Sequence, residues 1–428
     1  MSILPSRLLP DSADVDADGM LRVGACRVDE LAAEFGTPLF VYDEQHLRSR
    51  CQEAVAAFGP ERVVYATKAF LCRAMADLVH SEGLLLDVAS GGELHTVLSA
   101  GVPANACVMH GNNKSPLELR MALSAGVRHL VLDSFDEMDR VEALVAEGLP
   151  VPAVLIRVTP GVHAHTHEFI ATGQDDSKFG FNLANGDAER AVRRAESSSA
   201  MRLVGTHCHI GSNVFDASGF AKAAEVMARF AIPLDLPELV LGGGLGVAYV
   251  AGEEAPTISS WGSILLDACD ALGVSSRVSV EPGRAIAASA AVTVYTVGTM
   301  KEIPGIRRYL AVDGGMSDNP RPVLYGSGYE ATLARSPFVD RSLSVRVVGK
   351  HCESGDVLLA DARLPADTSV GDLLVTPVTG AYGHSMGSNY NKVPRPAVVF
   401  VNGGAAREVV RRETYEDLLA TDVFEPKR

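Results

Sequence analysis

The amino-acid sequence predicts an α/β protein in which a TIM barrel, (β/α)8, is joined to a second, C-terminal, β-rich domain. Two observations predict the barrel. About eight short apolar segments alternate with amphipathic helical segments from residue 63 to residue 281, and glycines stand where the helices should end. The third observation is that helical patterns become scarce after about residue 290, which predicts the β-rich domain. A doubly wound open sheet is the alternative to the barrel.

The domain boundaries follow from these changes of pattern, and a chain of 428 residues is long enough for two domains. We expect residues 1–44 to form an N-terminal segment, residues 45–289 the barrel and residues 290–428 the β-rich domain. Residues 38–42 predict a strand that joins the β-rich domain, so that the barrel is inserted between two parts of it. The other N-terminal patterns are an irregular stretch over residues 1 to about 25 and helices over residues 28–35 and 45–58.

The helices of the barrel carry start and stop signals. Ser115–Glu118 and Ser134–Glu137 are capping boxes, the first with proline at the first helical position. Glycines at the expected left-handed helix ends are Gly83, Gly101, Gly126 and Gly148. The expected barrel strands are Val63–Thr67, Leu84–Val88, Cys107–His110, Leu130–Asp133, Val154–Val158, Val204–His209, Leu239–Gly242 and Val278–Glu281. Those of the β-rich domain are Val292–Val297, Tyr309–Asp313, Ser344–Gly349, Asp356–Ala360, Asp372–Val378 and Ala397–Asn402, followed by a helical pattern over Thr414–Leu419.

Function in a TIM barrel gathers at the carboxyl ends of the strands, and nearly every predicted strand ends in a polar or glycine-rich group. These groups are Lys68, Asp87, Ser90, His110, Asp133, Arg157, His209, Ser212, Gly242–Gly244 and Glu281–Arg284.

Lys68 is the first of these groups, at the end of the apolar stretch Val63–Phe70. A desolvated lysine is a candidate nucleophile for imine chemistry, because burial lowers its pKa and frees the amine. The alternative is a lysine at a strand end with a buried stem and a head in water.

The glycine run Gly242–Gly246 and the acid Glu281 indicate an anion site and an acid–base site. Glycine lets backbone N–H groups approach a phosphate closely, and phosphate sites often lie late in a TIM barrel. The spacing of these glycines is not that of a dinucleotide fingerprint. Glu281 could hold a pyridine nitrogen protonated, or it could form a surface ion pair with Arg284.

A metal site and a reactive thiol are two further candidates. His163, His165 and His167 alternate along the chain, as do His207 and His209, but no matched acid or cysteine set completes a tetrahedral zinc site, so we expect no metal. Cys352 stands beside Glu353, and these polar neighbours favour a reactive thiol over an inert apolar one.

Composition excludes several classes of partner. The formal charge of −15 argues against a nucleic-acid groove or an anionic membrane. No apolar run reaches the roughly 18 residues of a membrane span, and the first residues lack the apolar core of a secretion signal. Seven scattered cysteines, an odd number, suit the reducing cytoplasm better than a disulfide framework.

Seven pieces of the sequence, together highly specific, resemble the diaminopimelate decarboxylases, which are fold-type III (alanine racemase-like) decarboxylases that use pyridoxal 5'-phosphate (PLP). The pieces occur in the order of the family and cover nearly the whole chain. They are Tyr65–Ala69, Asp87–Leu94, His207–Ser212, Gly242–Gly246, Glu281–Arg284, Cys352–Asp356 and Gly380–Tyr382.

The resemblance implies a barrel with a β domain, and the decarboxylation of meso-2,6-diaminopimelate to L-lysine and CO2, the last step of lysine biosynthesis. It implies that Lys68 forms the imine with PLP, that His209 stacks on the ring and that Glu281 pairs with the pyridine nitrogen. The implied phosphate residues are Ser212, Gly244, Glu281, Pro282, Gly283, Arg284 and Tyr382. The implied substrate residues are Arg284, Arg321, Tyr325, Glu353 and Tyr382, with Cys352 as the proton donor; Cys352 and Glu353 reach across a homodimer into the partner's site.

Charge supports the substrate that the resemblance implies. Lysine or ornithine presents a lone distal ammonium, whereas diaminopimelate also presents a distal carboxylate, for which Arg284 and Arg321 supply charge-assisted donors. One small departure is Asn213, where the family often has glutamine.

Four other functions stay open at the level of the sequence. They are a decarboxylase of the same fold acting on D-ornithine, lysine or arginine, an amino-acid racemase on the same barrel, a non-catalytic PLP carrier and, more remotely, a metal hydrolase. Direct assay with each amino acid, release of CO2 and insensitivity to chelators separate these functions from the one implied.

Overall fold

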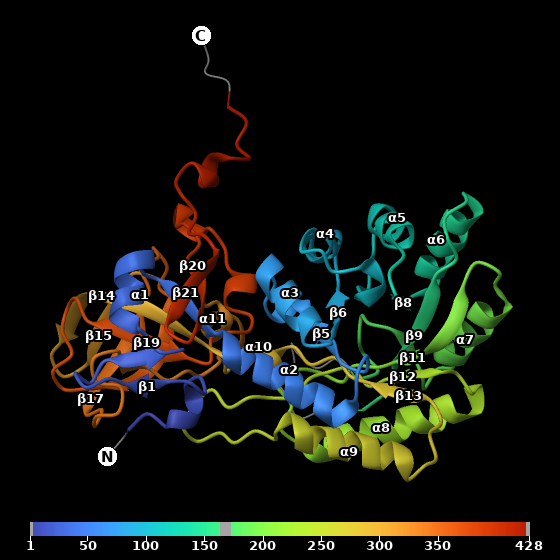
Figure 1. Cartoon of the computed structure of the whole chain (residues 1–428), viewed down its shortest axis with the longest axis horizontal. Helices are drawn as coiled ribbons and strands as arrows, with labels where there is room; N and C mark the ends of the chain where they lie inside the picture. Colours follow the sequence, from blue (N-terminus) through green and yellow to red (C-terminus); the bar gives the residue numbers. More distant parts are fainter. Residues whose placement is uncertain (1–2, 163–172, 425–428) are drawn as a thin grey trace. The chain divides into compact units, whose positions relative to one another are not determined.

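Figure 1 shows the computed structural model of the chain, which describes residues 3–162 and 173–424. The chain divides into two compact units by its internal contacts. One unit comprises Arg48–Val247 and Glu254–Ile286, and the other comprises Met1–Leu47, Ala248–Glu253 and Ala287–Arg428.

The first unit is a closed barrel of parallel strands. Its sheet runs in the order β13-β12-β11-β9-β8-β7-β6-β5, with the short β10 (Phe181–Asn182) beside β9. The two ends of this path meet, because Val63 and Val280 form a parallel bridge and the Val64 N–H donates to the Val280 carbonyl at 2.8 Å. The doubly wound alternative is therefore wrong. The strands are β5 (Val64–Ala66), β6 (Leu85–Val88), β7 (Cys107–Met109), β8 (His129–Leu132), β9 (Ala153–Thr159), β11 (Arg202–His207), β12 (Glu238–Val240) and β13 (Arg277–Ser279), and each predicted strand overlaps one of them.

The sequence forms these strands because they are apolar on both faces. In β5, β6, β7 and β9 every residue is buried, as expected when one face lines the barrel interior and the other packs under helices. The helices that follow are α3 (Arg73–Ser81), α4 (Gly91–Ser99), α5 (Pro116–Ala125), α6 (Phe135–Ala146), α7 (Asp187–Ser197), α8 (Ala217–Ala231) and α9 (Ile258–Asp270), with the one-turn α10 (Arg284–Ala287) after β13 and α2 (Glu44–Phe58) before β5.

The predicted helix signals are confirmed with one correction. Ser115 and Glu118 form the reciprocal capping box of α5, and all four predicted glycines have a positive φ. Ser134 also caps α6, by accepting the Glu137 N–H. The Glu137 carboxylate does not complete the second box; it accepts the Asp133 N–H and pairs with Lys114 instead. The prediction of a second full capping box was wrong, since a buried lysine draws the carboxylate away.

The second unit is built on a sheet in the order β18-β17-β15-β14-β4-β20-β21, with β19 paired to β14 and β16. The predicted strand at residues 38–42 is β4 (Leu39–Asp43); it pairs antiparallel with β14 and parallel with β20, at the centre of this sheet. The other strands are β14 (Ala291–Ile303), β15 (Arg307–Val312), β16 (Thr332–Leu333), β17 (Leu343–Val348), β18 (Val357–Leu364), β19 (Leu373–Pro377), β20 (Ala397–Asn402) and β21 (Ala405–Val410), and the helices are α1 (Val28–Phe35) and α11 (Arg321–Tyr325).

Two local predictions in this unit were wrong. The N-terminal stretch is not irregular throughout, because β1 (Asp14–Val15), β2 (Leu21–Val23) and β3 (Cys26–Arg27) form a small antiparallel sheet. The helical pattern over Thr414–Leu419 yields only a 3-10 turn at Asp417–Leu419. Among the described residues, no helix combines the length and apolar character needed to cross a bilayer.

Candidate functional site

Polar side chains gather at the carboxyl ends of the barrel strands, where the fold predicts function. Lys68 follows β5, Asp87 lies near the end of β6, His110 follows β7, His207 ends β11, and Glu281 follows β13. All of them except Lys68 are buried. Because the strands close into a barrel, residues far apart in the chain meet at this one end.

Lys68 lies in a 3-10 turn (Thr67–Ala69) immediately after β5. Its side chain is 52% exposed, and its Nζ lies 3.9 Å from Oδ2 of the buried Asp87. The Thr67 hydroxyl donates to the Asp87 carbonyl at 2.7 Å and ties the turn to β6. The Lys68 side chain is therefore half exposed rather than desolvated, and a buried carboxylate lies beside its amine.

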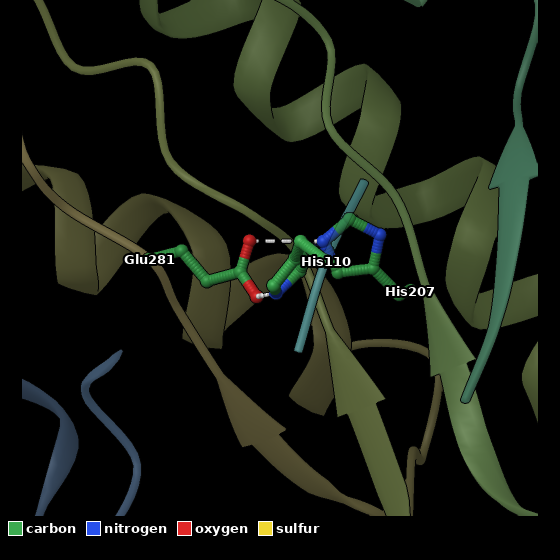
Figure 2. Close-up of side chains that lie close together, drawn as sticks. All are labelled: His110, His207 and Glu281. Carbon is green, nitrogen blue, oxygen red and sulfur yellow. Dashed lines mark hydrogen bonds and ion pairs between the residues drawn. The ribbon is translucent and has the colours of Figure 1, made fainter. Parts of the chain in front are cut away.

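The Glu281 carboxylate faces two neighbouring histidines, one at each of its oxygens (Figure 2). Its Oε2 forms a hydrogen bond with His207 Nε2 at 2.9 Å. Its Oε1 lies 3.1 Å from His110 Nε2 without forming a hydrogen bond, and that oxygen is buried. His110 Nε2 also lies 3.9 Å from Asp87 Oδ1. A row of alternating acids and bases thus runs from Lys68 through Asp87 and His110 to Glu281.

The pKa values of this row reflect burial and neighbouring charge. Burial alone would raise the pKa of Glu281, but His207 and His110 hold it well below its ordinary value. Burial opposes the charge of His110, yet the Asp87 and Glu281 carboxylates raise its pKa. Burial lowers the pKa of His207, and Glu281 only partly offsets this. Glu281 is therefore an anion that faces a neutral His207 and a His110 biased toward the cation.

His110, His207 and Glu281 each offer one ligand atom, and these atoms lie within 4.8 Å of one another. We assign them to hydrogen bonding of the carboxylate rather than to a cation, because His207 Nε2 already bonds Glu281. His207 is therefore not paired with His209 on a strand face; β11 ends at His207. His163, His165 and His167 lie outside the described residues.

His209 contacts the glycine turn that follows β12. Its Nδ1 accepts the Gly243 N–H at 3.2 Å. Burial, with Lys68 and Arg157 nearby, lowers the pKa of His209 well below its ordinary value. The ring is thus neutral and carries its proton on Nε2. The ring is therefore fixed and uncharged beside the glycine turn.

The glycine turn approaches neighbouring backbone so closely that no side chain fits. A Cβ on Gly242 would lie 2.4 Å from the Cys208 carbonyl oxygen, and one on Gly243 would lie 2.1 Å from that of Glu281. Gly244 has a φ of +110°, and a Cβ there would lie 2.3 Å from the carbonyl oxygen of Gly211. The turn is a smooth backbone surface of the kind that cradles a phosphate.

Ser212 and Arg284 meet beside this turn. The Arg284 Nη2 donates to the Ser212 hydroxyl at 2.9 Å, and Arg284 is buried. The Pro282 carbonyl accepts the Ala66 N–H at 3.1 Å, and a Cβ on Gly283 would lie 2.9 Å from the Ala66 Cβ. The structure therefore brings six of the predicted residues to one barrel end: Lys68, His209, Ser212, Gly244, Glu281 and Arg284.

Other predicted strand-end groups have structural partners. Ser90 caps α4 by accepting the Glu93 N–H. Arg157 Nε lies 3.5 Å from Asp133 Oδ1, and its guanidinium stacks 4.4 Å from the Phe179 ring centroid. These residues support the barrel end.

The second unit holds Arg321, whose guanidinium is buried without an acid. Arg321 is 3% exposed, lies 4.2 Å from the Tyr249 ring centroid and donates to the Tyr329 hydroxyl at 2.5 Å. Among the described residues no ion pair of Arg321 is found, and its Nε is buried with no hydrogen-bond partner. Burial opposes its charge, but the tyrosines keep its pKa raised. A buried cation of this kind is suited to an anionic ligand.

Cys352 and Glu353 lie in the loop between β17 and β18. Cys352 is exposed, whereas the other six cysteines are buried. Its N–H donates to Asn391 Oδ1 at 2.9 Å. Asp356 ties this loop to the segment after β15, since it accepts the Met316 N–H at 2.7 Å as well as the His351 N–H at 2.9 Å. The loop presents a thiol on a fixed backbone.

Tyr325 and Tyr382 lie in the same unit. Tyr325 is half-buried and ends α11, the helix that begins at Arg321. Tyr382 is half-buried with a φ of +61°, a conformation that costs energy for a residue with a side chain. Such an outlier indicates a functional constraint.

Sequence reasoning missed the roles of His110 and His207. His110 was noted only as a strand-end group, and His207 only as half of an alternating pair. The signal that could have found them is the placement of a titratable residue at the ends of several strands of one barrel, which puts His110, His207 and Glu281 together.

Comparison with known proteins gives consistent results. A family model described as "Pyridoxal-dependent decarboxylase, pyridoxal binding domain" matches residues 44–288. The chain is 47% identical to the diaminopimelate decarboxylase of Corynebacterium efficiens, over 98% of this chain and 95% of that one.

Solved structures are similar as well. The diaminopimelate decarboxylase of M. jannaschii, in complex with L-lysine, has a TM-score of 0.90 at 31% identity, covering 97% of this chain and 98% of that one. That of Helicobacter pylori, also complexed with L-lysine, has a TM-score of 0.84 at 30% identity, covering 92% of this chain and 98% of that one.

Proposed function

This chain belongs to the diaminopimelate decarboxylase family, and from that premise we propose how its residues carry out the PLP-dependent conversion of meso-2,6-diaminopimelate to L-lysine and CO2. This reaction is the last step of lysine biosynthesis. The chemistry that bound PLP supplies is that of an electron sink for the pair left on the substrate carbon when CO2 departs.

The barrel end fits this cofactor in three respects. Glu281 Oε1 is a buried acceptor with no hydrogen bond, so it can accept the proton of a pyridinium nitrogen. The glycine turn leaves room only for an unsubstituted backbone at Gly244, and Ser212 and Arg284 add polar donors beside it. The Glu281 carboxylate is the observation that carries the proposal, because its buried Oε1 accepts no hydrogen bond from the described residues and lies 3.1 Å from His110 Nε2.

Each barrel residue then has one task. Lys68 would hold the cofactor by its Nζ amine, with Asp87 beside that amine. Glu281 keeps the ring nitrogen protonated. His209 offers a neutral ring face and stays fixed by the Gly243 N–H. Backbone at Gly244, Pro282 and Gly283, with Ser212, Arg284 and Tyr382, binds the phosphate.

The substrate is selected by charge. We assign Arg321, with Arg284, to the distal carboxylate of diaminopimelate, because a buried guanidinium without an acid gains most from an anionic partner. Tyr325 and Tyr382 line the substrate, and Glu353 receives its ammonium. A decarboxylase for lysine, ornithine or arginine would need an acid in place of Arg321.

Cys352 is the proton donor to the substrate carbon after CO2 leaves, since it is the exposed thiol of the chain. Following the family resemblance, we propose that Cys352 and Glu353 act in the site of a second copy of this chain, so that the working enzyme is a homodimer. Its place is the cytoplasm, to which the seven free cysteines are suited.

The test is incubation of the purified protein with PLP and meso-diaminopimelate, with CO2 and lysine followed together. Equal amounts of both products are expected. The epimer of the substrate without CO2 would indicate a racemase, and faster release of CO2 from D-ornithine, lysine or arginine would overturn the substrate assignment. Absence of any turnover, with PLP bound, would indicate a carrier.

A further inference from the structure

We propose that His110 and His207 are positioning residues that hold the Glu281 carboxylate as an oriented anion, His207 by occupying Oε2 and His110 by flanking Oε1, so that Oε1 faces the pyridine nitrogen. This inference rests on the proposed function, because it assigns Glu281 to that nitrogen. The two histidines touch neither the substrate nor the reacting atoms; they act through Glu281.

The two histidine rings contact different oxygens of the Glu281 carboxylate (Figure 2). His207 is fully inside the barrel end, and its Nε2 lies 2.9 Å from Oε2 in a hydrogen bond. His110 Nε2 forms an ion pair with the other oxygen, Oε1, at 3.1 Å, and that oxygen accepts no hydrogen bond from the described part of the protein. The protein therefore donates a hydrogen bond to Oε2 of Glu281, whereas Oε1 can accept a hydrogen bond from one further donor.

The protonation of the rings follows from their neighbours. His207 must carry its proton on Nε2 to donate it, because an ionised carboxylate only accepts. His110 lies between Asp87 and Glu281, at 3.9 Å and 3.1 Å from their oxygens, so a positive charge on it is shared by two acids. The other charged group near both rings is Arg157 on β9.

The two histidines are needed because Glu281 is buried. A buried carboxyl without such partners takes up a proton and becomes a donor on one oxygen. A neutral Glu281 would no longer favour a protonated pyridine nitrogen. The two histidines therefore keep Glu281 ionised, and an ionised Glu281 favours a protonated pyridine nitrogen.

The test compares two ligands of the cofactor-free protein: PLP and 1-deazapyridoxal 5'-phosphate, in which carbon replaces the ring nitrogen. Binding of each is titrated by fluorescence to the unmodified protein and to His207→Phe and His110→Phe. Each Phe variant is expected to weaken PLP binding by about tenfold or more. His207→Phe removes a hydrogen bond to a charged group, which contributes about 1.5–3 kcal/mol, and His110→Phe removes the ion pair at 3.1 Å. Binding of the deaza compound should change by less than about twofold, since it has no nitrogen for Glu281 to contact.

Two controls separate positioning from structure. His207→Gln and His110→Gln keep an N–H donor near the Nε2 position and should recover much of the PLP affinity. His129→Phe removes a half-buried histidine at the start of β8, 4.0 Å from Glu238, and should change the binding of neither ligand. As a second readout, the 15N shift of the ring nitrogen of bound, labelled PLP should move toward the unprotonated value in the Phe variants.

The outcomes are distinct. The inference would be overturned if both Phe variants weakened the binding of PLP and of the deaza compound equally, or weakened the binding of neither. If one variant does not fold, the other decides. Failure of the proposed function looks different: the unmodified protein would then bind PLP no better than the deaza compound, or bind neither.

Discussion

The assignment of Arg321 to the distal carboxylate makes a quantitative prediction for Arg321→Met. Methionine keeps an unbranched apolar stem that can pack on Tyr249 but removes the charge and the donors. We expect kcat/KM for meso-diaminopimelate to fall by about 150- to 5000-fold. A substrate carboxylate would then be left unpaired beside a 3% exposed position, and losing one partner of such a buried pair costs about 3–5 kcal/mol, at 1.36 kcal/mol per tenfold.

The assay uses two substrates that differ at the distal end. D-Lysine lacks the distal carboxylate, so the rate at which it is decarboxylated should be nearly unchanged in Arg321→Met. Arg341→Met is the matched control: Arg341 is equally buried in the same unit but already pairs with Glu330 at 2.7 Å. It should lower stability without changing the preference between substrates. Equal loss on diaminopimelate and D-lysine in Arg321→Met would refute the assignment.

Three further perturbations test other parts of the account. Gly244→Ala should weaken PLP binding at least about tenfold, because its Cβ would lie 2.3 Å from a backbone oxygen at a φ of +110°. Gly219→Ala is the control, since a Cβ there meets nothing within 4 Å and PLP binding should not change. Equal PLP affinities of the two variants would contradict the assignment of the glycine turn to the phosphate. Burial raises the pKa of Asp318 from 3.8 to about 7. The contribution of this carboxyl to the free energy of unfolding is therefore fully present below about pH 4 and is lost as the pH rises toward 7. The loss is on the order of 4 kcal/mol at most. Urea unfolding at several pH values should show this fall, and Asp318→Asn should flatten it; an unchanged slope would contradict the assignment. Cys352→Ala should lower kcat by about 100-fold with no change in the unfolding temperature, because the thiol is exposed. Cys51→Ala is the control: Cys51 is buried, so this variant should lower the unfolding temperature instead. Full activity of Cys352→Ala would show that Cys352 is not the proton donor.

The barrel could be predicted from sequence because its signals are local. Each strand is a short apolar run buried on both faces, and caps such as Ser115 and Gly126 mark the helices without knowledge of the rest of the chain. The small strands β1 to β3 carry too few residues for a period-2 pattern to be recognised. β21 was missed because its residues are mostly exposed and its sequence, with Ala405, Ala406 and Arg407, lacks apolar alternation.

The residues of the candidate site also differ in how far the sequence alone could predict their roles. Glu281 and the glycine turn stand out by residue type, so a sequence pattern could find them. The histidines around Glu281 could not be assigned, since His110 and His207 depend on partners from distant strands. The surroundings of Lys68 were misjudged for the same reason: the sequence shows an apolar strand before the lysine but not how much of its side chain stays exposed.

The central claim is that Lys68 carries the cofactor, and borohydride reduction followed by peptide mass spectrometry tests it most directly. Borohydride converts the bond between an amine and the cofactor aldehyde to a stable secondary amine. The account predicts a phosphopyridoxyl group on Lys68 and none on Lys114, which follows β7 and is buried against Glu137. A label on Lys114 or on any other lysine, with Lys68 unmodified in a protein that binds PLP, would contradict it.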